Sequence, residues 1–188
     1  MEVSMPKGAE GMPGVIVPRK AIGELRKLVD ETNTDITIAL SEAKIRFSVN
    51  DTVLTSKLID GTFPDYQRVI PEGNEKQLDV STKAFAAAVD RVSAISSEKS
   101  RAVKLNLASG SLILSASSPE DGSATEELEV TYQGDSMEIG FNSGYLLDII
   151  RQIESDSARL MLADAASPTI VSEEDEAGAL YVLMPMRV

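Results

Sequence analysis

This chain has few types of side chain that could catalyse a reaction or bind a metal ion. Histidine and cysteine are absent from its 188 residues, which removes the usual general base, the thiol nucleophile and the commonest zinc ligands. Catalysis would have to use carboxylates, lysine, tyrosine or serine, and no spacing of two carboxylates indicates a hydrolytic centre. The sequence therefore favours a binding protein without catalytic residues, cofactor or metal.

The C-terminal segment has side chains suited to an adaptable binding surface. Met184 and Met186 lie on either side of Pro185, and the flexible thioethers of methionine suit an apolar pocket. The alternative interpretation is that these residues belong to an ordinary buried final strand.

A second candidate surface is a row of basic residues on a predicted helix. Residues seven positions apart project from the same side of a helix, and two such pairs occur here, Arg19 with Arg26 and Lys20 with Lys27. The net charge of −12 argues against tight binding of nucleic acid. The row is therefore either an ordinary solvated face or a local basic surface for a loose contact with DNA.

Acidic residues gather in two other segments, which we expect to be outward-facing loops and strands. Residues 173–176 (EEDE) lack the spacing and the turn glycine of an EF-hand, so they predict a solvated loop and no metal site. The other segment contains Glu120, Asp121, Glu126, Glu127 and Glu129.

The elements that must position these residues recur along the chain. Alternating apolar residues precede a helix with apolar residues at helical spacing, and three strands follow. This β-α-β-β-β pattern begins near residues 15, 78 and 137. Ser81 and Asn142 are predicted to cap the second and third helices. The third strand of the second copy is expected at residues 128–132.

The repeats predict an α+β fold in which two units pair into one domain, with their helices side by side. Residues 72–188 would form a complete domain, whereas residues 1–71 would form an incomplete one that contains a single unit. We expect Ile22, Leu25 and Val29 to be buried against the strands of that first unit, and its edge to be open to self-association.

Five strings of the sequence stand out together: residues 15–20 (VIVPRK), 55–58 (TSKL), 63–66 (FPDY), 137–142 (MEIGFN) and 181–187 (YVLMPMR). In this order they resemble the bacterial DNA polymerase III beta subunit, the sliding clamp. The resemblance implies a DNA-clamp fold of repeated half-domains, with helices on the inner face of antiparallel sheets. It also implies a homodimeric ring around duplex DNA, to which this chain would contribute half of the middle domain and the whole third domain.

The resemblance also implies a groove that binds short linear peptides of the polymerase III alpha subunit, the clamp loader, other polymerases and repair proteins. Arg68 and Asn142 would meet peptide carbonyls, and apolar residues would bury its anchors. Part of the groove lies upstream in the family, so the pocket here is expected to be open on one side. The implied groove residues are Pro64, Arg68, Val69, Asn142, Tyr145, Val182, Leu183, Met184, Pro185, Met186 and Arg187.

Two further surfaces follow from the same resemblance. Arg19, Lys20, Arg26 and Lys27 would face the DNA and make sequence-independent contacts. The end of the second helix would meet the other subunit through Ala94, Ile95, Lys99 and Arg101. Ser100 stands where some members of the family carry a bulky aromatic residue, so the contribution of that position is in question.

The leading function is that of a processivity factor, a non-catalytic clamp that tethers the replicative polymerase to DNA. The alternative is a generic peptide-binding repeat module with no role at DNA, and a hydrolase that depends on carboxylates is a distant third. No run of about 18 apolar residues and no secretory leader is evident in the sequence. A cytoplasmic protein is therefore expected.

Overall fold

The computed structural model describes residues 5, 8–30, 34–96, 101–173 and 179–187. The chain divides into two compact units, Ser4–Asp65 and Tyr66–Val188, and each is described here by itself. The division falls between residues 65 and 66, whereas the sequence interpretation placed it between residues 71 and 72. No helix among the described residues is long and apolar enough to cross a membrane.

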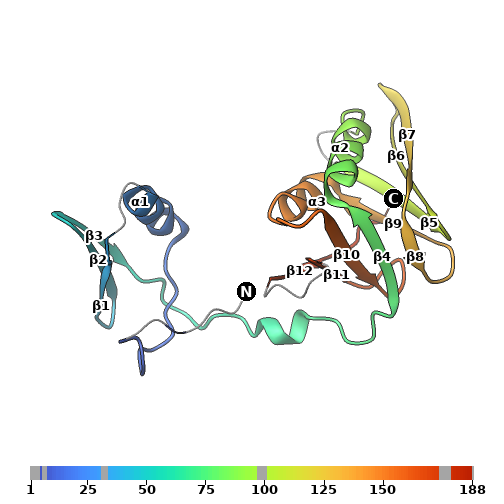
Figure 1. Ribbon diagram of the computed structural model, residues 1–188. Coiled ribbons are helices and arrows are strands. Elements are labelled where there is room, and N and C mark those ends of the chain that lie inside the picture. Colours follow the sequence, from blue (N-terminus) through green and yellow to red (C-terminus); the bar gives the residue numbers. More distant parts are fainter. Residues whose placement is uncertain (1–4, 6–7, 31–33, 97–100, 174–178, 188) are drawn as a thin grey trace. The chain divides into compact units, whose positions relative to one another are not determined.

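The first unit consists of one helix and one antiparallel sheet (Figure 1). Its apolar layer consists of Ile45, Phe47 and Val49, which alternate along the middle strand and are buried. Helix α1 contacts the second and third strands, and Ala21 is its buried residue. The elements are α1 (Arg19–Asp30), β1 (Thr37–Leu40), β2 (Lys44–Val49) and β3 (Thr52–Lys57), with the strands in the order β1-β2-β3.

Two expectations for this unit were wrong in part. Leu25 and Val29 are half-buried, but Ile22 is 46% exposed. Ala21 and Leu25, four positions apart, share the buried face of α1, and Ile22 lies to the side of that face. The expected strand before α1 is reduced to one bridge, in which the N–H of Ile59 donates to the carbonyl oxygen of Ile16 at 2.9 Å.

The second unit contains two complete copies of the repeat. The first copy consists of β4 (Lys76–Ser81), α2 (Thr82–Ser93), β5 (Ala102–Ala108), β6 (Ser111–Ser118) and β7 (Gly122–Glu129). The second consists of β9 (Met137–Asn142), α3 (Ser143–Ile150), β10 (Ser157–Leu162), β11 (Thr169–Glu173) and β12 (Leu180–Leu183). A 3-10 helix, η1 (Tyr66–Val69), precedes them, and β8 (Thr131–Gln133) lies between them.

The strand expected at residues 128–132 is in fact divided between two sheets. Strand β7 begins earlier, at Gly122, and Leu128 within it lies opposite Leu112 of β6. Val130 leaves that strand, and Tyr132 of β8 lies opposite Leu78 of β4 in the other sheet. The chain changes sheets at Val130, a change that hydrophobic alternation does not reveal.

Each repeat supplies a strand to the sheet of the other. The sheets have the strand orders β12-β11-β10-β4-β8 and β7-β6-β5-β9, so β4 joins the strands of the second copy and β9 joins those of the first. Helices α2 and α3 contact each other, and one continuous apolar core fills the unit. Among its largest fully buried side chains are Phe85, Leu105, Phe141, Leu146 and Leu160.

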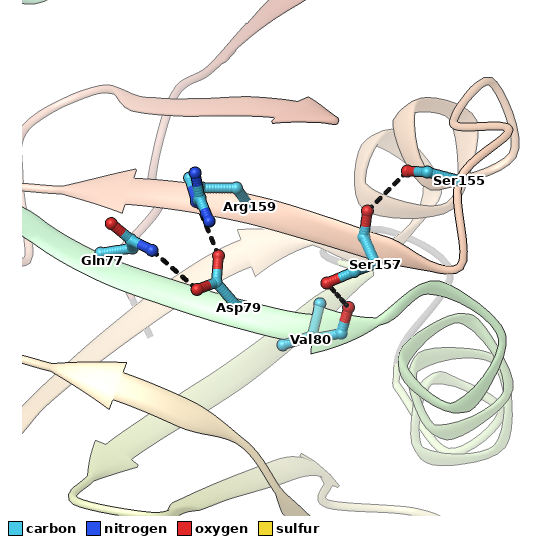
Figure 2. A network of polar contacts seen from close by, with 6 residues as sticks. All are labelled: Gln77, Asp79, Val80, Ser155, Ser157 and Arg159. Atoms are coloured by element: carbon cyan, nitrogen blue, oxygen red, sulfur yellow. Dashed lines mark hydrogen bonds and ion pairs between the residues drawn. The ribbon is translucent and has the colours of Figure 1, made fainter. Parts of the chain in front are cut away.

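Polar contacts reinforce the seam between β4 and β10 (Figure 2). Arg159 Nε donates to Asp79 Oδ1 at 2.7 Å, and Gln77 Nε2 donates to the other oxygen of Asp79 at 2.7 Å. Ser157 Oγ donates to the carbonyl oxygen of Val80 at 3.5 Å. Arg159 and Ser157 of β10 therefore link to β4, a strand of the other repeat, and Gln77 supports Asp79 from within β4.

The two helix starts of this unit differ. Asn142 caps α3 as predicted, since its Oδ1 accepts the N–H groups of Gly144 at 2.9 Å and Tyr145 at 3.3 Å. Ser81 occupies the predicted N-cap position of α2, but its side chain makes no capping hydrogen bond. The N–H of Thr82 donates instead to the carbonyl oxygen of Asp156 at 2.9 Å. The backbone before β10 thus accepts a hydrogen bond from the first N–H group of α2, which has no partner within the helix.

Candidate functional site

A pocket of about 550 Å³ opens between the start of α3 and the C-terminal tail. It joins two segments that are separated in sequence by two strands and their loops. The lining residues are Asn142, Tyr145, Asp148, Ile149, Val182, Leu183, Met184, Pro185 and Met186.

Backbone geometry fixes the tail beside α3. Strand β12 pairs with β11 and ends at Leu183, and Pro185 has no N–H to extend a ladder. Two residues later, the N–H of Met186 donates to the carbonyl oxygen of Gly140 at 2.9 Å, which ties the tail to β9. The predicted final strand is thus shorter than expected, and its methionines follow the strand instead of continuing it.

The pocket presents large apolar side chains to solvent. Tyr145 is 62% exposed and Met184 is 63% exposed, whereas Leu183 between Val182 and Met184 is buried. An exposed aromatic ring and a flexible thioether that line the same pocket suit an apolar ligand. The buried-strand alternative therefore holds for Leu183 and fails for Met184.

Asn142 is a polar residue of the pocket lining, and its side-chain oxygen is already used within the protein. Asn142 Oδ1 accepts the two N–H groups at the start of α3, so the Nδ2 group is the part that could donate to a ligand carbonyl. Asp148 adds a carboxylate to the lining. A ligand that combines apolar anchors with backbone carbonyls fits this chemistry.

Four of the implied groove residues are not part of the pocket lining. Arg68 and Val69 lie in η1, where Val69 is 60% exposed, and Arg187 follows the pocket as an exposed residue. Pro64 belongs to the other compact unit. Their place in a groove stays a prediction.

Asp148 and Ile149 were missing from the expected groove, although the sequence contained a signal for them. Both lie one helical turn after Tyr145, at the third and fourth positions, so the three side chains share a face of α3. Ile149 is half-buried, so its side chain contacts the core as well as lining the pocket.

The four basic residues of α1 are all exposed. Two of them make ion pairs within the helix, Arg26 with Asp30 at 3.8 Å and Lys27 with Glu24 at 3.0 Å. Such exposed pairs are weak and screened by salt, so they lower the local positive charge without removing it. Arg19 and Lys20 occupy the first turn.

The residues expected at a subunit surface lie near the end of α2. Ala94 is the C-terminal cap of α2 and, with Arg101, lines a small cavity of about 280 Å³. Arg101 has a φ of 45°, and its carbonyl oxygen accepts the N–H of Ser143 at 2.8 Å. Ile95 is half-buried beside them, and Lys99 lies outside the described residues.

The acidic segment before β8 is not uniformly outward-facing. Glu126 of β7 lies opposite the buried Leu114 and accepts two hydrogen bonds from Arg91 of α2, one of them from Nε at 3.0 Å. The Arg91 guanidinium lowers the pKa of the Glu126 carboxyl below its usual value, first through this hydrogen bonding. The expectation of a solvated outer face was therefore wrong for Glu126, which bridges the sheet to the helix. Residues 174–176 lie outside the described residues.

Known proteins with related sequences agree on one family. Residues 67–187 match the model of the DNA polymerase III beta subunit, C-terminal domain, and residues 1–65 match that of its central domain. The chain belongs to the DNA polymerase III beta subunit family. This confirms the resemblance and the α+β clamp fold.

Individual relatives support the assignment to the DNA polymerase III beta subunit family. The beta sliding clamp of Caulobacter vibrioides is 50% identical over 187 residues, which are 100% of this chain and 50% of the relative. That of Escherichia coli K12 is 39% identical, over 98% of this chain and 51% of the relative. A DnaN sliding clamp from Bartonella birtlesii, solved bound to griselimycin, has a TM-score of 0.94 and 54% identity, over 99% of this chain and 50% of that chain. The chain thus spans about half the length of these relatives.

Proposed function

We propose that this chain serves as part of a DNA sliding clamp, a non-catalytic processivity factor that encircles duplex DNA in the cytoplasm. The observation that carries the proposal is the exposed apolar pocket between α3 and the C-terminal tail, in a chain of the DNA polymerase III beta subunit family. A processivity factor must hold its polymerase while contacting DNA without sequence preference. The pocket supplies a place for the first task, and α1 supplies a basic surface for the second.

The proposed ligand of the pocket is a short linear peptide of a replication or repair protein. Tyr145, Met184 and Met186 would bury a leucine and an aromatic anchor, and the Nδ2 group of Asn142 would donate to a backbone carbonyl. Arg68, Val69 and Pro64 are proposed to extend the groove. The polymerase alpha subunit and the clamp loader are the proposed sources of such peptides.

The proposed contact with DNA is weak and depends on topology. Arg19, Lys20, Arg26 and Lys27 would approach phosphates, but two of them are engaged in ion pairs and the chain carries a net charge of −12. Few phosphate contacts give low affinity and permit sliding. Closure of a homodimeric ring, with Ala94, Ile95, Lys99 and Arg101 at the subunit contact, would retain the full-length protein on DNA.

Calorimetry with a peptide that contains glutamine, leucine and an aromatic residue tests the pocket. The double variant Met184→Ala, Met186→Ala should bind the peptide at least about tenfold more weakly, because it removes buried contacts. Leu180→Ala is the matched control, since Leu180 is an exposed residue of β12, the strand just before the methionines, and does not line the pocket. Equal affinity of the double variant and the wild type would show that the peptide site lies elsewhere.

The alternative function, a peptide-binding module without a role at DNA, shares the same pocket. The two functions separate on the full-length protein loaded onto DNA. A clamp stays on closed circular DNA and slips from the linearised molecule, whereas a simple peptide-binding module is retained on neither.

A further inference from the structure

The pocket between α3 and the C-terminal tail presents a thioether to solvent. Met184 lines this pocket and is 63% exposed, and it directly follows Leu183, the last residue of β12. All lining residues of the pocket belong to the second unit, whose two repeats are both complete. The chemistry of this thioether therefore does not depend on the first unit.

The composition of the chain directs two-electron oxidants to methionine. The sequence contains seven methionines and no cysteine, histidine or tryptophan. Peroxides convert a thioether to a sulfoxide, and a chain without thiols offers them no more reactive sulfur. The oxidant has to reach Sδ, so the exposure of each methionine decides how fast it reacts.

Exposure separates the methionines into two groups. Among the described residues, Met5, Met12 and Met184 are exposed, at 67%, 41% and 63%. Met5 and Met12 lie in the first unit and outside the pocket, so Met184 is the exposed methionine that lines it. The half-buried group consists of Met137, Met161 and Met186.

We propose that Met184 is a site of reversible oxidation by peroxide, and that its sulfoxide weakens binding of a peptide in the pocket. A lone pair of Sδ forms a bond to one peroxide oxygen while the O–O bond breaks. The departing hydroxide takes up the proton of the transferred oxygen and leaves as water, so sulfur loses two electrons and the peroxide gains them. Methionine sulfoxide reductases, one for each sulfoxide epimer, reverse the change. The effect on binding rests on the proposed function, whereas the modification itself does not.

The sulfoxide changes the pocket in two ways. It replaces a polarisable apolar sulfur by a strongly polar group, whose oxygen loses its water when an apolar anchor covers it. Its oxygen is also an acceptor, and Asn142 of the same lining has a free donor in Nδ2, because Oδ1 caps α3. The sulfoxide would thus compete with the peptide carbonyl for that donor. We expect peptide affinity to fall about tenfold, the size of an uncompensated polar burial.

The contacts that hold the tail in place do not involve the Met184 side chain. Leu183, the residue before it, is buried in the core of the second unit. The N–H of Met186, two residues after it, donates to the carbonyl oxygen of Gly140 at 2.9 Å. An oxygen added to the exposed sulfur of Met184 leaves both contacts intact, so oxidation should change binding while the melting temperature stays nearly constant.

Hydrogen peroxide treatment of the full 188-residue chain, followed by fragment-ion mass spectrometry, measures the oxidation rate at each methionine. We expect Met184 to react about as fast as Met5 and Met12, and several-fold faster than the half-buried Met161. A saturating, methionine-free peptide that contains glutamine, leucine and an aromatic residue should slow oxidation of Met184 and leave Met5 and Met12 unaffected. A Met184 rate no higher than that of Met161 in the absence of peptide would overturn the modification site.

Calorimetry with the same peptide tests the effect on binding, with each protein compared before and after peroxide. The wild type should lose about tenfold in affinity and regain it on treatment with both sulfoxide reductases. Met184→Leu should change little, because it has no sulfur at this position, and the matched control Met12→Leu should lose as much as the wild type.

Two results would overturn the effect on binding: an unchanged affinity of the oxidised wild type, or an equal loss in Met184→Leu. A chain that binds no peptide before peroxide would overturn the proposed function together with the effect on binding. The oxidation rates measured without peptide decide the modification site separately.

Discussion

The N–H of Met186 donates to the carbonyl oxygen of Gly140 at 2.9 Å, so the C-terminal tail is held against β9, immediately before Asn142 starts α3. Together with the pairing of β12 to β11, this bond holds the methionine segment beside α3. Tyr145 and Met184 line one pocket as a result, although 38 residues separate them in the sequence.

Truncation of Tyr145 should weaken peptide binding without unfolding the protein. Tyr145→Ala removes an exposed aromatic anchor, so we expect a loss of peptide affinity of about tenfold and a nearly unchanged melting temperature. Fluorescence anisotropy and thermal unfolding measure the two quantities. Tyr66→Ala is the control, because Tyr66 is exposed and does not line the pocket. Equal losses for the two variants would argue against the pocket as the peptide site.

The two helix caps should respond differently to alanine. Asn142→Ala deletes the acceptor of two N–H groups and should cost about 1 kcal/mol of unfolding free energy. Ser81→Ala should cost much less, because the Ser81 side chain makes no capping hydrogen bond. Urea denaturation of both variants tests the difference. A larger loss for Ser81→Ala would contradict the assigned caps.

Acid should destabilise the turn between β10 and β11 through Asp164. Its Oδ1 accepts the N–H groups of Ala166 and Ser167, each at 2.8 Å, and the first of these hydrogen bonds is the largest cause that lowers the pKa of the Asp164 carboxyl. A carboxyl with a lowered folded-state pKa stabilises the fold above its unfolded pKa of about 3.9, and this contribution is lost as the pH falls through the folded-state value.

Thermal unfolding between pH 3 and pH 7 measures this contribution. We expect the melting temperature of Asp164→Asn to fall less steeply than that of the wild type as the pH drops below about 4. Asp148→Asn provides a control at another exposed carboxyl. Parallel pH profiles of wild type and Asp164→Asn would show that the turn does not contribute.

Limited proteolysis should cut first in the first unit and in the segment that joins it to the second. Nearly all large, fully buried side chains lie in the second unit, whose two repeats cover each other, so local opening there should be rarer. Asn74 Nδ2 donates to the carbonyl oxygens of Met161 and Pro168, which ties the chain to the second unit from that point onward. Mass spectrometry should therefore identify a resistant fragment that begins between residues 66 and 74. Equal resistance of the first unit in dilute solution would contradict the division into half-domain units.

The isolated chain should associate little with linear duplex DNA at physiological salt. Its basic surface on α1 is small, partly paired and opposed by the net charge of −12. Anisotropy of a labelled duplex should show binding only at low salt, and Arg19→Ala with Lys20→Ala should reduce it further. Nanomolar binding that resists salt would favour a conventional DNA-binding protein.

The sequence by itself determined the order of elements and the local chemistry. The apolar alternation before Asn142, the Asn142 cap and the helical spacing after it are properties of adjacent residues, so they predicted β9 and α3 correctly. The absence of histidine and cysteine limited the chemistry in the same direct way. The methionines around Pro185 identified a candidate binding segment before any contact was known.

Only the tertiary structure decided which faces meet. Periodicity shows that a segment has an apolar face, but the partner of that face depends on strand pairing between distant residues. Ile22 has the same spacing as a core residue and is nevertheless exposed, because the described first unit contains one helix and one sheet where the second contains two of each. The acidic Glu126 lies opposite Leu114 because β7 continues the β6 ladder, and there Arg91 compensates its charge. Local sequence thus specified the elements, while non-local hydrogen bonds and burial selected the pocket.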